Sequence, residues 1–168
     1  YTQEQIDEAL EAEDPWKVVP SRDENGHGTF LAGIAAGTAQ PDQEFSGAAP
    51  ESTLIVVKLK QAKEYLRKFY FLPDGVDFYQ ENDIMFAVTY AIHCAKQLQM
   101  PLVICIGLGN NQGTHRGENP LAITLDNVTR NPQTVVAVAA GNEGNARHHY
   151  EGVIRPDQEE ATVVELRV

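Results

Sequence analysis

The sequence predicts an α/β fold of three layers, in which a mostly parallel sheet carries helices on both faces. Residues 102–106 and 134–140 are apolar, β-branched runs with the length of buried strands, and residues 120–128 between them form an amphipathic helical pattern. Strand, helix and strand in this order are typical of a parallel sheet with right-handed crossovers. A chain of 168 residues with 42% hydrophobic content can form one domain with its own core.

The first half of the chain predicts two helices. Thr2 can cap a helix that reaches Ala12, with Gln5 at the third helical position to complete a capping box. Asp14-Pro15 is expected to break the helical pattern before a polar loop. Residues 27–37 are rich in Gly and Ala. This composition suits a helix that packs very close to another backbone.

The second half begins with a predicted buried strand at 54–59. Residues 60–80 mix aromatic and basic side chains without clear periodicity and are interpreted as an insertion. Asp83 is expected to cap a helix to Leu98, because apolar residues recur there at helical spacing. A last strand is expected at 161–168, so the chain is expected to be an internal piece of a longer protein.

Composition and charge disfavour several classes of protein. There are 13 Lys and Arg against 24 Asp and Glu, a net charge of −11, which disfavours binding to nucleic acid. Apolar runs such as 102–106 are far shorter than the roughly 20 residues of a membrane helix. Cys94 and Cys105 form no disulfide framework and no metal motif, and we expect two buried free thiols.

Two motifs can carry chemistry. Gly26-His27-Gly28 opens the small-residue helix, with glycines that allow a substrate to approach the imidazole; a single histidine is nonetheless more often structural. Gly141-Asn142 directly follows the predicted strand 134–140. Functional groups gather where parallel strands end, and an Asn amide can donate a hydrogen bond to a developing oxyanion.

Four motifs together resemble the subtilisin-like serine proteases. They are His-Gly-Thr-x-x-Ala-Gly at 27–33, Gly-Ala-Ala-Pro at 47–50, Gly-Leu-Gly at 107–109 and Ala-Ala-Gly-Asn-Glu-Gly at 139–144, in the order of the family. Residues 103–109 and His148-His149-Tyr150 look most like the germination-associated subtilases of spore-forming anaerobes. The family usually has Ser in place of Gly107.

The resemblance implies a role for each matching residue. His27 would be the general base and acid of a Ser/His/Asp triad, and Asn142 the side-chain donor of the oxyanion hole. The residues that would bind the substrate backbone are Gly107, Leu108, Gly109, Ala139, Ala140 and Gly141. The implied partner is a protein or peptide, and the implied location is secreted or spore-associated. Calcium, which many relatives bind, is the one metal implied, and no ligands for it can be assigned.

Two elements of the family are absent. No upstream strand carries the catalytic Asp, and Ser21, Ser46 and Ser52 all lie outside the nucleophile motif Gly-Thr-Ser-Met-Ala. The chain is therefore predicted to be an incomplete subtilisin-like fold, inactive alone because it lacks a nucleophile. Without the central strand that carries the Asp, strands 54–59 and 102–106 would have unpaired edges, which favours self-association.

Several alternatives remain open. The parent is either an active endopeptidase or a protease-like regulator that has lost its triad, and the presence of His27 and Asn142 favours the enzyme. A dinucleotide-binding turn at 107–113 is disfavoured, because no helix pattern begins directly after it. The other histidines favour surface positions over metal binding; they are His93, His115, His148 and His149.

Overall fold

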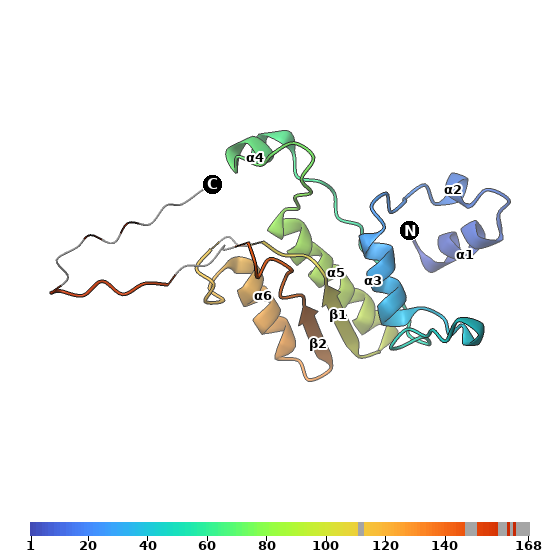
Figure 1. Cartoon of the computed structure of the whole chain (residues 1–168). Helices are drawn as coiled ribbons and strands as arrows, with labels where there is room; N and C mark the ends of the chain where they lie inside the picture. Colours follow the sequence, from blue (N-terminus) through green and yellow to red (C-terminus); the bar gives the residue numbers. More distant parts are fainter. Residues whose placement is uncertain (111–112, 147–150, 158–160, 162, 164–168) are drawn as a thin grey trace. The chain divides into compact units, whose positions relative to one another are not determined.

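The computed structural model describes residues 1–110, 113–146, 151–157, 161 and 163, which belong to two compact units, Tyr1–Lys58 and Leu59–Val168 (Figure 1). No helix in the described part of the chain is long and apolar enough to cross a membrane.

A two-stranded parallel sheet lies in the second unit. Strands β1 (Leu102–Ile106) and β2 (Thr134–Val138) pair in register, with Leu102 opposite Thr134 and Ile106 opposite Val138. Helix α6 (Pro120–Thr129) forms the crossover between them. The predicted α/β class and both strands are confirmed, although β2 ends two residues earlier than expected.

Helix α5 (Glu81–Leu98) precedes β1 and begins earlier than the sequence predicts. Its N-cap is Gln80, so the expectation that Asp83 caps the helix is wrong. Asp83 lies in the first helical turn and forms an ion pair with Lys60 at 3.3 Å. An acidic residue in the first turn is favourable because the amino end of a helix is partially positive. Asp83 therefore supports the helix start by charge.

The apolar core of the second unit lies between the sheet and helices α5 and α6. The helices contact each other, α5 contacts β1 and α6 contacts β2, so both helices lie on one face of the sheet (Figure 1). The buried residues at this junction are Ile84, Val88, Ala91, Ala95, Leu102, Ile106 and Thr134. Alternate strand residues point to the other face, where Val103 is 71% exposed and Val135 is 57% exposed.

The two cysteines differ in burial. Cys94 on α5 is half-buried and Cys105 on β1 is exposed, and both are free thiols. The expectation of buried thiols is therefore wrong for Cys105 and only partly met for Cys94. The reason is the strand period of two, which places Cys105 with Val103 on the face opposite helices α5 and α6.

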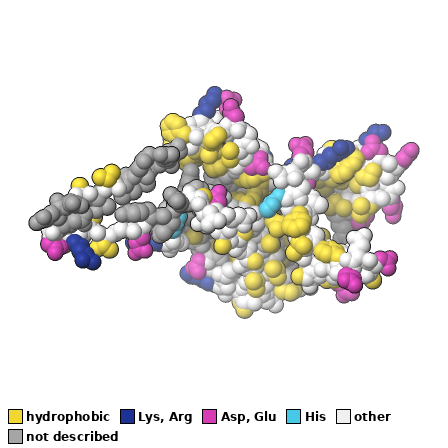
Figure 2. All heavy atoms as spheres, viewed as in Figure 1, with side chains coloured by type: hydrophobic (Ala, Val, Ile, Leu, Met, Phe, Trp, Pro, Cys, Tyr) yellow, Lys and Arg dark blue, Asp and Glu magenta, His cyan; other side chains and the backbone are white. Residues whose placement is uncertain are grey.

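The predicted insertion at 60–80 contains the short helix α4 (Glu64–Phe69). The Ala62 amide donates to the Phe78 carbonyl at 2.7 Å and joins the two ends of the segment. The Tyr70 ring lies 5.5 Å from the Phe78 ring, centroid to centroid. Hydrophobic side chains remain at the surface over α4 (Figure 2). The segment is thus a closed loop with exposed aromatic residues.

The first unit begins with helix α1 (Gln3–Glu11), which has the predicted capping box between Thr2 and Gln5. Pro15 does not simply break the chain, because it starts a second helix, α2 (Pro15–Val18). Proline fits the first position of a helix, where its missing N–H costs no hydrogen bond. The Asp14 side chain accepts a hydrogen bond from the Trp16 amide at 3.2 Å and caps α2.

Helix α3 (His27–Ala36) forms where the small residues predict it. After the short 3₁₀ helix η1 (Pro41–Gln43), the chain returns to the end of α3. The amides of Gly47, Ala48 and Ala49 donate to carbonyls of residues 34–37 at 2.8 to 3.0 Å. The predicted close approach of another backbone is therefore confirmed.

The predicted strand at 54–59 is not formed. The segment belongs to no ladder in the described part of the chain, and Leu54 is exposed. The apolar pattern is present, but a strand needs a partner for its backbone hydrogen bonds. Of the strand expected at 161–168, residues 161 and 163 are described and are not in a strand, and the rest lies outside the described residues.

Candidate active site

His27 is the first residue of α3 and is exposed. The turn before it depends on Gly26, whose φ of +86° is a left-handed conformation that suits glycine. The His27 amide donates to Oδ1 of Asn25 at 3.3 Å. The structure therefore places the imidazole at the rim of a tight turn, at the opening of a helix, as the motif predicts.

Asp23 is the residue of this turn that sequence reasoning missed. Its Oδ1 accepts from the amides of Asn25 at 3.0 Å and Gly26 at 2.8 Å. Its Oδ2 accepts from the amide of Thr29 at 2.9 Å and from the Thr29 hydroxyl at 2.7 Å. Hydrogen bonds from Gly26, then from Thr29 and Asn25, hold the pKa of the Asp23 carboxyl well below its usual range.

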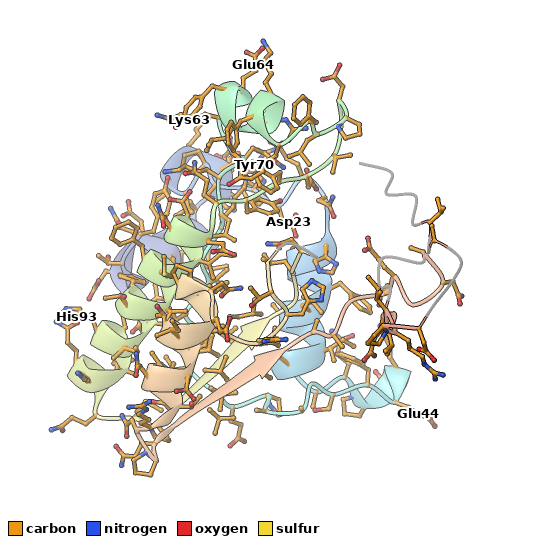
Figure 3. All side chains as sticks on the ribbon, turned by 90° about the vertical axis from the view of Figure 1, so that its left-hand side faces the viewer. Asp23, Glu44, Lys63, Glu64, Tyr70 and His93 are labelled. Atoms are coloured by element: carbon orange, nitrogen blue, oxygen red, sulfur yellow. The ribbon has the colours of Figure 1, made fainter. Side chains whose placement is uncertain are left out.

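One sequence signal could have found Asp23. Gly26 is the N-cap of α3 and has no side chain to cap the helix. An acidic side chain a few residues before such a glycine is well suited to bind the exposed amides at the start of the helix. Figure 3 shows Asp23 in the loop that leads into α3.

The predicted substrate-binding segments lie at one edge of the sheet. Residues 107–109 directly follow β1, and residues 139–141 directly follow β2. Since the strands are parallel neighbours, both segments leave the sheet at its carboxyl edge. The Ala139 amide donates to the Ile106 carbonyl at 3.0 Å, which carries the pairing one step beyond β2. The structure thus brings these two segments together.

Asn142 follows at the same edge and is exposed. Gly141 before it has a φ of +86°, so the chain turns sharply after β2. The Ala146 amide donates to the Glu143 carbonyl at 2.8 Å and closes the next turn. A carboxamide at a strand end in this position can donate a hydrogen bond to a substrate oxygen.

His27 and Asn142 belong to different units, 1–58 and 59–168. Within the second unit, the structure places three predicted parts of the site at one edge of the sheet. They are the segments 107–109 and 139–141 and the residue Asn142. His27 lies in the first unit, at the start of α3.

The other candidate residues do not form a metal centre in the described part of the chain. Figure 3 shows the labelled His93 on the outer side of α5, where it is exposed, and His115 lies in a loop with a φ of +54°. His148 and His149 lie outside the described residues. Within the described ranges, no group of three or more His, Cys, Asp or Glu side chains could hold a metal ion.

The glycine-rich segment after β1 also differs from a dinucleotide-binding turn. The next helix, α6, begins only at Pro120, with Asn119 as its N-cap. Asp126, the acidic residue at the distance expected for ribose binding, lies within α6 and pairs with Arg130 at 3.2 Å. Both observations agree with the sequence-based argument against a nicotinamide enzyme.

A histidine that opens a helix and a carboxamide at the carboxyl edge of a parallel sheet are parts that a serine-peptidase site uses. The family model of peptidase S8, the Subtilase family, matches residues 2–165. The chain therefore belongs to the subtilase family, as its motifs indicate.

The solved structure of the CspB protease of Clostridium perfringens is similar to this chain. The sequence identity is 32% and the TM-score is 0.73. The match covers 87% of this chain and 29% of the CspB protease chain. The chain therefore spans less than a third of the length of that protease.

Proposed function

We propose that the protein to which this chain belongs is a subtilisin-like serine endopeptidase, in which His27 is the general base and Asn142 the oxyanion donor. The observation that carries the proposal is the sheet edge where Asn142 meets segments 107–109 and 139–141, in a chain of the subtilase family. The solved relative with 32% identity is named a protease, which supports an active enzyme.

The chemistry follows from the functional groups. The His27 imidazole takes the proton of a serine hydroxyl as that oxygen attacks the peptide carbonyl, and later returns it to the leaving amine. The Asn142 amide donates to the carbonyl oxygen as its negative charge develops.

The main chain would bind the peptide substrate. Residues 107–109 are an exposed to half-buried extension of β1, suited to pair with an extended peptide. Residues 139–141 form the other side of this binding edge. Gly107 stands where the family usually has Ser. Backbone hydrogen bonds do not depend on that side chain, so pairing is retained.

The serine and aspartate of the triad would come from outside these 168 residues. The three serines present, Ser21, Ser46 and Ser52, are in another sequence context than the family nucleophile. The chain by itself is therefore proposed to be inactive, since an acyl-enzyme needs the nucleophile.

Active-site labelling with a fluorophosphonate probe tests the role of His27 in the complete protein. His27→Ala should abolish labelling, because the serine loses its base. The matched control is His93→Ala, since His93 is also an exposed helical histidine. Undiminished labelling of His27→Ala would reject the role of His27. A complete protein that takes up no probe at all would reject the enzyme and favour the protease-like regulator.

Steady-state cleavage of a peptide tests the role of Asn142. Asn142→Ala should lower kcat by about 10²- to 10³-fold, the range measured for the corresponding Asn of subtilisin, another member of this family, and borrowed from it here. The control is Asn145→Ala, a carboxamide in the same loop. Equal rates for the two variants would contradict the oxyanion role.

The motifs at 103–109 and 148–150 support a germination-associated subtilase that is secreted or spore-associated. An antibody against the chain should then detect the protein in purified spores or in the culture medium. Its confinement to the vegetative cytoplasm would contradict this location.

A further inference from the structure

We propose that Asp23 is a positioning residue for His27. The proposal rests on the role of His27 as the base given above. The Asp23 carboxylate binds the backbone on both sides of His27, and so fixes the turn from which the imidazole projects.

The hydrogen bonds divide evenly about His27. Oδ1 of Asp23 accepts from the amides of Asn25 and Gly26, which precede the histidine. Oδ2 accepts from the amide and the hydroxyl of Thr29, two residues after it. The four donor–acceptor distances are 2.7 to 3.0 Å. One side chain therefore joins the loop before His27 to the first turn of α3.

The carboxylate lies on the inner side of this turn. A Cβ built on Gly28 would lie 3.6 Å from Oδ2 of Asp23, an ordinary contact distance. The Asp23 carboxylate therefore lies beside the backbone of Gly28, the residue after His27. Because Gly26 has no side chain to cap α3, Asp23 supplies the cap from outside the helix.

Both carboxylate oxygens are used, so the amide isostere cannot replace them. An Asn at this position has a single acceptor oxygen and can satisfy only one side of the turn. The pKa of Asp23 lies well below its usual range, so the charged form is present at neutral pH. The negative charge also faces the partially positive start of α3, which favours it.

A loosened turn should affect the chemical step more than binding. Displacement of a catalytic group by about 1 Å can lower a rate by about 10²-fold. The four hydrogen bonds of Asp23 given above all stay within residues 23–29, so their loss should leave substrate contacts at the sheet edge unchanged. We therefore expect Asp23→Asn to act on kcat.

The first arm of the experiment is kinetic and uses the complete protein. Asp23→Asn should lower kcat by about 10- to 100-fold and change KM by no more than about twofold. Glu24→Gln is the matched control, because it removes the same charge from the next residue of the loop. Thr29→Val should share the defect, and Thr29→Ser, which keeps the hydroxyl, should restore it. Equal kcat for Asp23→Asn and Glu24→Gln would overturn the proposal.

The second arm does not depend on catalysis. NMR signals of the His27 ring and of the Thr29 amide are recorded for the same variants. Asp23→Asn should shift or broaden both signals, while amides of α5 and β1 keep their positions and report an intact second unit. Unchanged His27 ring signals would overturn the positioning role.

The two arms separate the present proposal from the proposed function. If His27→Ala retains probe labelling, the role of His27 as base fails. Altered His27 ring signals in Asp23→Asn would still establish that Asp23 orients the imidazole. Thr29→Val provides a second readout where Asp23→Asn fails to fold.

Discussion

Gly47 lies directly against Gly37 at the end of α3. The Gly47 amide donates to the Gly37 carbonyl at 2.9 Å, and a Cβ built on Gly47 would lie 2.3 Å from the Gly37 nitrogen. That distance is too short for any side chain. Because both residues are glycines, the backbone at Gly47 can approach Gly37 closely enough to hydrogen-bond at the end of α3, the helix that begins with His27.

The first prediction follows from this contact. Gly47→Ala should lower the free energy of unfolding by about 1 to 3 kcal/mol or more, since backbone must move to admit a methyl group. Gly33→Ala is the control, because Gly33 lies within α3 and nothing lies within 4 Å of a Cβ built on it. This variant should be neutral or stabilising by about 0.5 to 1 kcal/mol. Urea unfolding of both variants measures the difference.

A second prediction concerns pH and Asp23. The pKa of its carboxyl is lowered from the ordinary value of 3.8, so its contribution to stability is complete above pH 3.8 and is lost as pH falls through the lower folded value. The Thr29 amide signal should therefore stay at its neutral-pH position well below pH 3.8 and move only in stronger acid. An amide that titrates with an ordinary carboxyl midpoint would contradict the four hydrogen bonds. Glu24→Gln should leave the pH dependence of the Thr29 amide signal unchanged. In Asp23→Asn this pH dependence should be absent, because the carboxyl that causes it is gone.

The third prediction concerns the start of α6. Oδ1 of Asn119 accepts from the Ala122 amide at 2.7 Å and caps the helix. Asn119→Ala should cost about 1 kcal/mol of stability. Asn119→Asp and Asn119→Ser keep a capping oxygen and should remain close to the wild type. Thermal unfolding distinguishes them, and an equal loss for all three would rule out capping as the cause.

The fourth prediction compares two isoleucines of the second unit. Ile84 on α5 is 7% exposed, whereas Ile123 on α6 is 50% exposed. Ile84→Ala leaves a cavity and should cost about 2 to 5 kcal/mol. Ile123→Ala should cost about 1 kcal/mol, because only part of its surface is removed from water. If urea unfolding shows a larger loss of stability for Ile123→Ala than for Ile84→Ala, the assignment of Ile84 to the core between the sheet and the helices is wrong.

The fifth prediction concerns self-association of the 168-residue chain. In the part of the chain that the structure describes, the sheet has two strands, and Val103 and Val135 are exposed on the face opposite helices α5 and α6. Free strand edges favour pairing with another chain. Light scattering should therefore report dimers or larger species as concentration rises. A monomer at all concentrations, with slow amide exchange in β1, would contradict the prediction.

Local patterns were enough to predict much of the secondary structure. The capping box of Thr2 and Gln5, the strands at 102–106 and 134–138 and the crossover helix between them all depend on residues close in sequence. The hydrogen bonds and the hydrophobic periodicity of these elements involve residues within a few helical turns or a single strand of one another. The motifs at His27 and Asn142 likewise indicated the family that the comparison confirms.

Other features depended on partners distant in the chain or on the exact path of a turn. The run 54–59 has a strand's composition but no neighbouring strand in the described residues, so it forms no ladder. Cys105 is apolar in context yet exposed, because helices α5 and α6 share one face of the sheet.

Local sequence patterns were thus enough to indicate the family, the succession of α5, β1, α6 and β2, and the candidate base and oxyanion donor. The folded chain was needed to show which strand pattern has a partner, which face of the sheet α5 and α6 pack against, and that Asp23 binds the turn around His27. The physical reason is that pairing, burial and a four-bond cap each require groups to meet in space, and composition alone does not specify those contacts.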